Sequence, residues 1–164
     1  MFRGRIGEAL IEQFFERFVK ILDEYGAISA IESDIRNAEN SVLIFSPFVD
    51  IRLPSTKKIL NEIKDAVSRG VNVKIVVKPN IRPEALKELK DTNAEVYARD
   101  THAKAVIIDE YKVLYLGSLN ILASYGKEDI MIRVSGLTGR SIIPKILSKK
   151  LYEELRAPTA EERI

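Results

Sequence analysis

Short apolar segments alternate with amphipathic segments through the middle of the chain, and this alternation constrains the fold more than any other feature. Residues 41–46, 71–77 and 94–98 are apolar runs bounded by Asn, Gly or Pro, which is typical of buried strands. Residues 54–70 and 83–90 instead carry apolar side chains three or four positions apart, as helices do. The order strand, helix, strand, helix, strand predicts an α/β domain with helices packed on a sheet.

The pattern changes after residue 100, where three strand-like segments follow one another without a helix between them. They span residues 102–108, 112–117 and 129–134, and a tight turn at Asp109–Tyr111 is expected to join the first two as a hairpin. Together with the first half, these strands predict a mixed β-sheet flanked by helices on both faces.

Further amphipathic helices are expected towards both ends of the chain. Apolar side chains recur with helical spacing in residues 5–23, 27–38 and 141–156. We therefore divide the chain into three parts, which are an N-terminal helical appendage (1–26), one α/β domain (27–157) and a frayed tail (158–164).

Composition narrows the classes of protein that the chain can belong to. Hydrophobic residues make up 46% and charged residues 30% of the 164 positions, as in soluble globular proteins. The absence of cysteine excludes disulfides, thiolate nucleophiles and cysteine-ligated zinc. No apolar run approaches the ~20 residues that cross a bilayer, and the N-terminus does not look like a signal peptide. We expect a cytoplasmic protein with no membrane partner.

His102 is the only histidine in the chain, and Lys104 follows it two positions later. Because side chains alternate along a strand, both are expected on one face, while Asp109 lies at the far end and shapes the turn. The hairpin then returns residues 117–120 (Gly-Ser-Leu-Asn) to the side of His102. An imidazole, an ammonium, a hydroxyl and a carboxamide would thus meet at one strand edge, which suits an anionic phosphodiester.

A carboxylate is also expected near this edge. Glu128 and Asp129 come directly before the third strand of this half. An acid beside His102 would fix the tautomer of the imidazole and stabilise its charged form.

These residues carry a resemblance to a known family. His102, Lys104 and Asp109, followed by Gly117-Ser118-Leu119-Asn120, resemble the H-x-K-x4-D and G-S-x-N motifs of the phospholipase D superfamily. The resemblance covers roughly residues 28–135, and Glu128 falls where the family carries its downstream acid. Seven residues separate Asp109 from Gly117 where six are expected, so a longer or bulged turn is predicted. Gly126 stands where the family often has Asn, which puts one phosphate contact in question.

The resemblance implies a phosphodiesterase that uses no metal and no cofactor. In this family one histidine attacks phosphorus to form a phosphohistidine, and a second protonates the leaving oxygen before water releases the product. A chain with one motif must therefore work as a homodimer with two copies of His102 at a two-fold axis. Two such histidines would titrate as a coupled pair and give a bell-shaped pH–rate profile.

Minimal one-motif homodimers of this family are similar to nucleases, which implies a nucleic-acid substrate, DNA rather than RNA. Lys104, Ser118 and Asn120 would bind the phosphate, and Glu128 would orient His102. A helicase or repair ATPase is the protein partner that the resemblance suggests.

Four basic residues, Arg52, Lys78, Arg82 and Arg99, follow the first three strands. If those strands are parallel, the four share the carboxyl edge of the sheet, where α/β proteins bind ligands. They would then form a track for a nucleic-acid backbone. Scattered solvated charge is an equal alternative.

The same residues also fit other interpretations. A lone strand-borne histidine is more often a structural residue than a catalytic one. Asp100-Thr101-His102 resembles a metal-binding pair, but the chain offers no second His and no Cys to complete it. A catalytically silent regulatory or binding module of the same fold is one alternative function, and a hydrolase of phospholipids or other phosphodiesters is another.

Overall fold

The computed structural model describes residues 2–126, 128–136 and 139–164. Within them, seven strands form one sheet in the order β1-β7-β6-β5-β2-β3-β4. The strands are β1 (Val19–Asp23), β2 (Ser41–Phe45), β3 (Asn72–Val77), β4 (Glu95–Ala98), β5 (Ala105–Ile108), β6 (Val113–Gly117) and β7 (Ile130–Ser135). Strands β2, β3 and β4 run parallel and the remaining pairs are antiparallel, which confirms the predicted mixed sheet.

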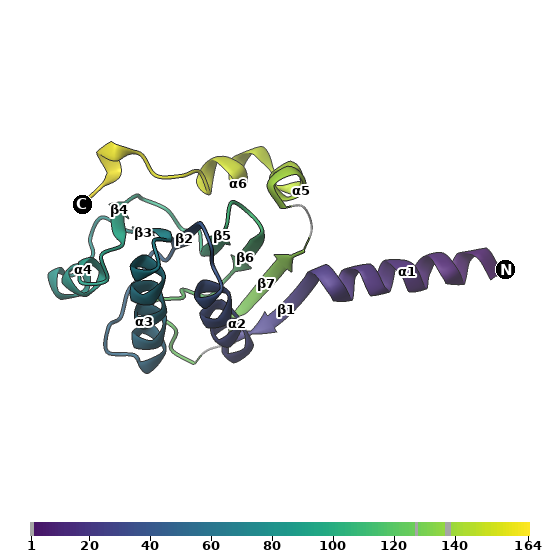
Figure 1. Cartoon of the computed structure of the whole chain (residues 1–164), viewed down its shortest axis with the longest axis horizontal. Helices are drawn as coiled ribbons and strands as arrows, with labels where there is room; N and C mark the ends of the chain where they lie inside the picture. Colours follow the sequence, from purple (N-terminus) through teal and green to yellow (C-terminus); the bar gives the residue numbers. More distant parts are fainter. Residues whose placement is uncertain (1, 127, 137–138) are drawn as a thin grey trace.

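Helices cover both faces of this sheet, as predicted (Figure 1). One face carries α2 (Glu24–Arg36), α3 (Pro54–Ser68) and α4 (Pro83–Lys90), and the other carries α5 (Gly139–Ile146) and α6 (Lys149–Glu154). Each face has its own apolar cluster, and the alternation of β5 divides its side chains between them. Val106 and Ile108 pack towards α2 and α3, whereas Ala105 and Ile107 pack towards α5 and α6.

The N-terminal segment differs from the expected single helix. Helix α1 (Phe2–Phe18) ends early, and residues 19–23 form strand β1, which pairs antiparallel with β7. Pairing with β7 holds these residues extended, and the Asp23 carboxylate accepts a hydrogen bond from Gly26 N at 2.8 Å and caps a new helix. Part of the expected appendage therefore lies in the sheet and in α2, while α1 projects from the body (Figure 1). No helix in the described part of the chain is long and apolar enough to cross a membrane.

The C-terminal segment differs as well. The expected helix over residues 141–156 is two helices, because the Ser148 side chain accepts a hydrogen bond from Leu151 N and begins α6 anew. Ile146, expected to point inward, is 65% exposed. The tail expected to fray lies along β4, where Ile164 N donates to Val96 O at 3.0 Å.

The hairpin begins later than expected. Strand β5 starts at Ala105, so residues 102–104 lead into the strand rather than belong to it. The turn after β5 has three consecutive residues with positive φ, Asp109, Glu110 and Tyr111. This longer left-handed turn accommodates the extra residue that separates the two motifs.

Candidate active site at the carboxyl edge of the sheet

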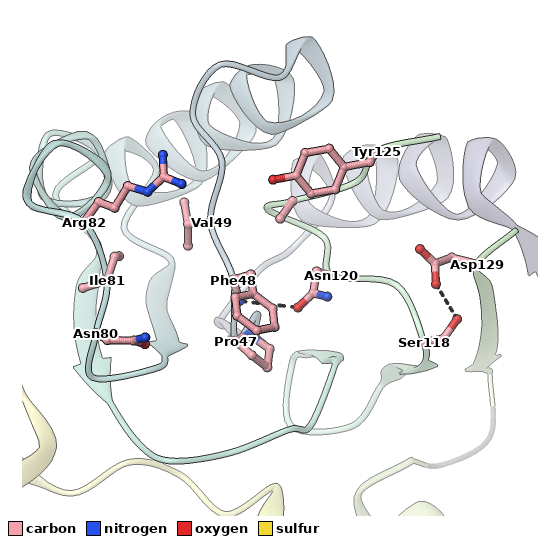
Figure 2. Close-up of a pocket in the computed structure, with 11 residues that line it drawn as sticks. Pro47, Phe48, Val49, Asn80, Ile81, Arg82, Ser118, Asn120, Tyr125 and Asp129 are labelled. Carbon is pink, nitrogen blue, oxygen red and sulfur yellow. Dashed lines mark hydrogen bonds between the residues drawn. The ribbon is translucent and has the colours of Figure 1, made fainter. Parts of the chain in front are cut away.

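A cavity of about 570 Å³ lies at the carboxyl edge of β2 and β3 (Figure 2). Residues 47–49 line it from the loop after β2, and residues 80–82 from the loop before α4. The connection between β6 and β7 closes the remaining side with Ser118, Asn120, Ala123, Tyr125 and Asp129. Ligands of α/β proteins commonly bind at this edge, so we take the cavity as the candidate site.

Ser118 and Asp129 form the most clearly defined polar pair of the cavity (Figure 2). The Ser118 hydroxyl donates to Asp129 Oδ1 at 2.7 Å and accepts from Ile130 N at 3.0 Å. Gly117 makes this arrangement possible, because a Cβ at its position would lie 2.0 Å from Ile130 O. The glycine of the motif therefore allows β6 and β7 to approach closely just before Ser118.

Asn120 connects the two sides of the cavity. Its Oδ1 accepts a hydrogen bond from Phe48 N at 3.4 Å, across 72 positions of sequence (Figure 2). The amide nitrogen of Asn120 has no hydrogen-bond partner among the described residues and, as a donor, suits a phosphate oxygen.

His102 and Lys104 lie beside the cavity but do not line it in the single chain. Lys104 O accepts a hydrogen bond from Gly117 N at 3.3 Å, which places this backbone next to Ser118. Lys104 Nζ donates to His102 O at 3.1 Å, and the His102 side chain is exposed. The expected meeting of all four motif side chains is thus seen for Ser118 and Asn120 alone.

The two neighbouring acids occupy different environments. Asp129 faces Ser118 in the cavity, whereas Glu128, the expected orienting acid, is exposed and does not line it. Position in the sequence cannot separate two adjacent carboxylates, because the loop conformation decides which one turns inward.

Asp109 lies at the opposite end of β5 and is buried. Its carboxylate accepts hydrogen bonds from the backbone nitrogens of residues 39, 40 and 41. Burial raises the pKa of Asp109, but the three backbone donors outweigh it and hold that pKa below its usual range. These contacts give the motif aspartate a structural role in anchoring the hairpin turn.

The four basic residues of the expected track divide into two pairs. Arg52 binds Asp50 through Nε at 2.9 Å and Nη2 at 2.6 Å, and Arg99 binds Glu162 through Nε at 2.8 Å. The positive charge of each of these two arginines is therefore neutralised by a neighbouring carboxylate.

The other pair lies at the cavity. Lys78 Nζ lies 5.3 Å from the centre of the Phe48 ring, and Arg82 lines the cavity. Arg82 makes no ion pair with any residue that the structure describes. Lys78 and Arg82 are thus the basic side chains of the track that remain for an anion.

The sequence pattern does not single out Phe48, Asp50 or Tyr125. The Tyr125 hydroxyl donates to Asp50 Oδ2 at 2.9 Å, and Arg52 holds the pKa of Asp50 well below its usual range. Phe48 and Asp50 could have been suspected because they follow a parallel strand, but Tyr125 sits in an irregular connection with no pattern of its own.

The strand order and the edge cavity that carries the G-S-x-N residues define a phospholipase D-like domain. A family model described as "Cardiolipin synthase, PLD-like domain" matches residues 31–135. The chain belongs to this family of phospholipase D-like domains.

Solved structures agree on the fold. The phospholipase D family member Nuc from Salmonella typhimurium matches with a TM-score of 0.66 and 16% identity, over 89% of this chain and 95% of Nuc. NucT from Helicobacter pylori matches with a TM-score of 0.63 and 20% identity, over 89% and 97%. The archaeal chromatin protein TrmBL2, whose structure shows DNA binding, matches with a TM-score of 0.53 and 17% identity, over 93% and 64%. Comparison with curated protein sequences gives no match.

Proposed function

We propose that this protein is a metal-independent phosphodiesterase that cleaves nucleic acid, as an endonuclease, through a phosphohistidine formed across a homodimer. The observation that carries the proposal is the convergence of Ser118 and Asn120, from the family motif, with Asp129 in one cavity. The fold similarity to TrmBL2, whose structure shows DNA binding, supports nucleic acid as the substrate class, with DNA preferred.

In the proposed first step, a nitrogen of neutral His102 attacks phosphorus, and the N–P bond forms as the P–O bond to the leaving group breaks. The charged His102 of the second subunit donates its proton to the leaving oxygen. In the second step that histidine, now neutral, takes a proton from water, and the resulting hydroxide attacks phosphorus and releases the first histidine. Lys104, Ser118 and Asn120 hold the phosphate oxygens.

The position of His102 is consistent with a shared site. Its side chain is exposed and does not line the cavity of the single chain, so it is accessible to a second chain. The chain holds one histidine and the chemistry needs two, which leaves a second copy of the chain as its source. A helicase or repair ATPase remains our proposal for a further partner in the cytoplasm.

One experiment tests this function. Plasmid and single-stranded DNA are incubated with the wild type and with His102→Ala, each with and without EDTA, from pH 5 to 9. We expect cleavage by the wild type alone, unaffected by EDTA, with a bell-shaped pH profile because one imidazole must be neutral and the other charged. Cleavage that survives the substitution or is lost with EDTA contradicts the proposal.

One observation favours a second candidate, a catalytically silent binding module. In the single chain His102 does not line the cavity. A pure dimer that binds nucleic acid, cleaves no phosphodiester and forms no phosphohistidine would support this candidate.

A further inference from the structure

Two exposed aromatic side chains flank the candidate site. Phe48 is 53% exposed and Tyr125 is 57% exposed, and both line the cavity that contains Ser118 and Asn120 (Figure 2). They come from loops far apart in the sequence, the one after β2 and the one between β6 and β7. Both rings are therefore open to a ligand that enters the polar cavity beside them.

Contacts with neighbouring residues anchor the Phe48 backbone and the Tyr125 side chain. The Phe48 backbone nitrogen donates to Asn120 Oδ1, and Lys78 Nζ lies 5.3 Å from the ring centre. The Tyr125 hydroxyl donates to Asp50, which is itself fixed by Arg52. Fixed aromatic rings lose little conformational freedom when a planar ligand stacks on them.

Cationic groups accompany the rings. Arg82 lines the same cavity, and the Lys78 ammonium lies over the ring of Phe48, which lines it too. Aromatic faces interleaved with cations are the arrangement that binds single-stranded nucleic acid, because unpaired bases stack on the rings while phosphates meet the cations. Bases in a duplex are already stacked and leave no open face for a ring.

We propose that Phe48 and Tyr125 are a stacking platform that makes the site selective for single-stranded nucleic acid over duplex. This inference rests on the proposed function, since it names the form of the substrate at the same site. Phosphates next to the stacked bases would face Arg82 and Lys78, and the phosphate to be cleaved would lie at Ser118 and Asn120.

Binding by the full-length chain tests the platform. The His102→Ala background prevents cleavage, and fluorescence anisotropy follows a single-stranded dT oligonucleotide, a U oligonucleotide and a duplex, each about 12 nucleotides long, at constant salt. Phe48→Ala and Tyr125→Ala are each expected to weaken binding of both single strands by about tenfold and to change duplex binding less than about twofold. Comparison of the dT strand with the U strand measures the preference for the sugar. Comparison of the single strands with the duplex measures the preference for unpaired bases.

Three further variants serve as controls. Tyr125→Phe retains the ring and is expected to bind single strands nearly as well as the parent, whereas Phe48→Leu retains apolar volume and is expected to lose binding. Tyr152→Ala removes an exposed aromatic outside this cavity and should have no effect.

The outcomes separate this inference from the proposed function. Equal losses on single strand and duplex, or no loss in either alanine variant, overturn the platform. If wild-type protein then still cleaves nucleic acid, the function stands and the platform alone fails. If the protein binds none of the three probes and cleaves neither form, both fail.

Discussion

At the scale of single residues, two adjacent acids, Glu128 and Asp129, could supply the carboxylate that positions the catalytic imidazole. Asp129 contacts Ser118 in the cavity, while Glu128 points to solvent, although family spacing favours Glu128. We propose Asp129 as a positioning residue that stabilises the charged imidazole. Under this proposal Asp129→Asn should lower kcat about 10- to 100-fold and move the alkaline limb of the pH profile to lower pH, since the proton-donating histidine of the assembled site would lose a negative neighbour. Glu128→Gln is the matched control and should change neither kcat nor the pH profile. If Glu128→Gln has these effects and Asp129→Asn does not, Glu128 is the positioning acid.

Asp109 gives a second prediction at this scale. Its carboxylate satisfies three backbone N–H groups, so Asp109→Ala would leave three partly buried donors without this partner. We expect the free energy of unfolding to fall by about 2–4 kcal/mol in urea titrations. Cleavage per folded molecule should be retained below the unfolding transition. A stable Asp109→Ala protein without activity would instead show that the motif aspartate acts in the chemistry.

At the scale of elements, the C-terminal segment is fastened to β4 and to the loop after it by a small ionic network. Glu162 accepts hydrogen bonds from Arg99 and Arg156, and the Arg99 hydrogen bond is the main cause that lowers the pKa of Glu162 to about 2. A carboxyl whose pKa is lowered in the folded state stabilises the fold at pH values above 4.5, the pKa that it has in the unfolded chain. This contribution is lost as the pH falls towards 2.

Glu162→Gln should therefore reduce stability at pH 7 by about 1–2 kcal/mol, a value limited by partial exposure to solvent. The difference from wild type should shrink at about pH 3.5, because the wild type has by then lost part of the same contribution. Urea unfolding at the two pH values measures this, with the exposed Glu153→Gln as control. A difference that stays constant with pH would rule out the ionic explanation.

At the scale of the whole molecule, the sequence predicts the α/β half well because its strands are short buried runs and its helices have one apolar face. Ile31 and Ile63 are fully buried at such positions. The ends of the chain are less predictable, since β1 is an edge strand whose residues also fit a helical period. Its extended form depends on pairing with β7, more than 100 positions away, and on the cap at Asp23.

The candidate site also combines residues that the sequence predicts with residues that it does not. The motif predicts Ser118 and Asn120 as site residues, and both line the cavity, whereas His102 and Lys104, predicted to lie beside them, do not line it. The choice of Asp129 over Glu128 and the presence of Phe48 and Tyr125 depend on loop conformations that carry no periodic signal. The neutralisation of Arg99 by Glu162 depends on a tail contact across 63 positions.

The central claim is that two chains share one active site, and subunit mixing tests it most directly. Wild type and His102→Ala are combined in equal amounts, allowed to exchange subunits fully, and assayed at the same total protomer concentration as wild type alone. Random assortment leaves wild-type homodimers as about one quarter of the dimers, so we predict about one quarter of wild-type activity if both histidines are needed. Activity of about one half would show that each chain works alone and would contradict the shared site.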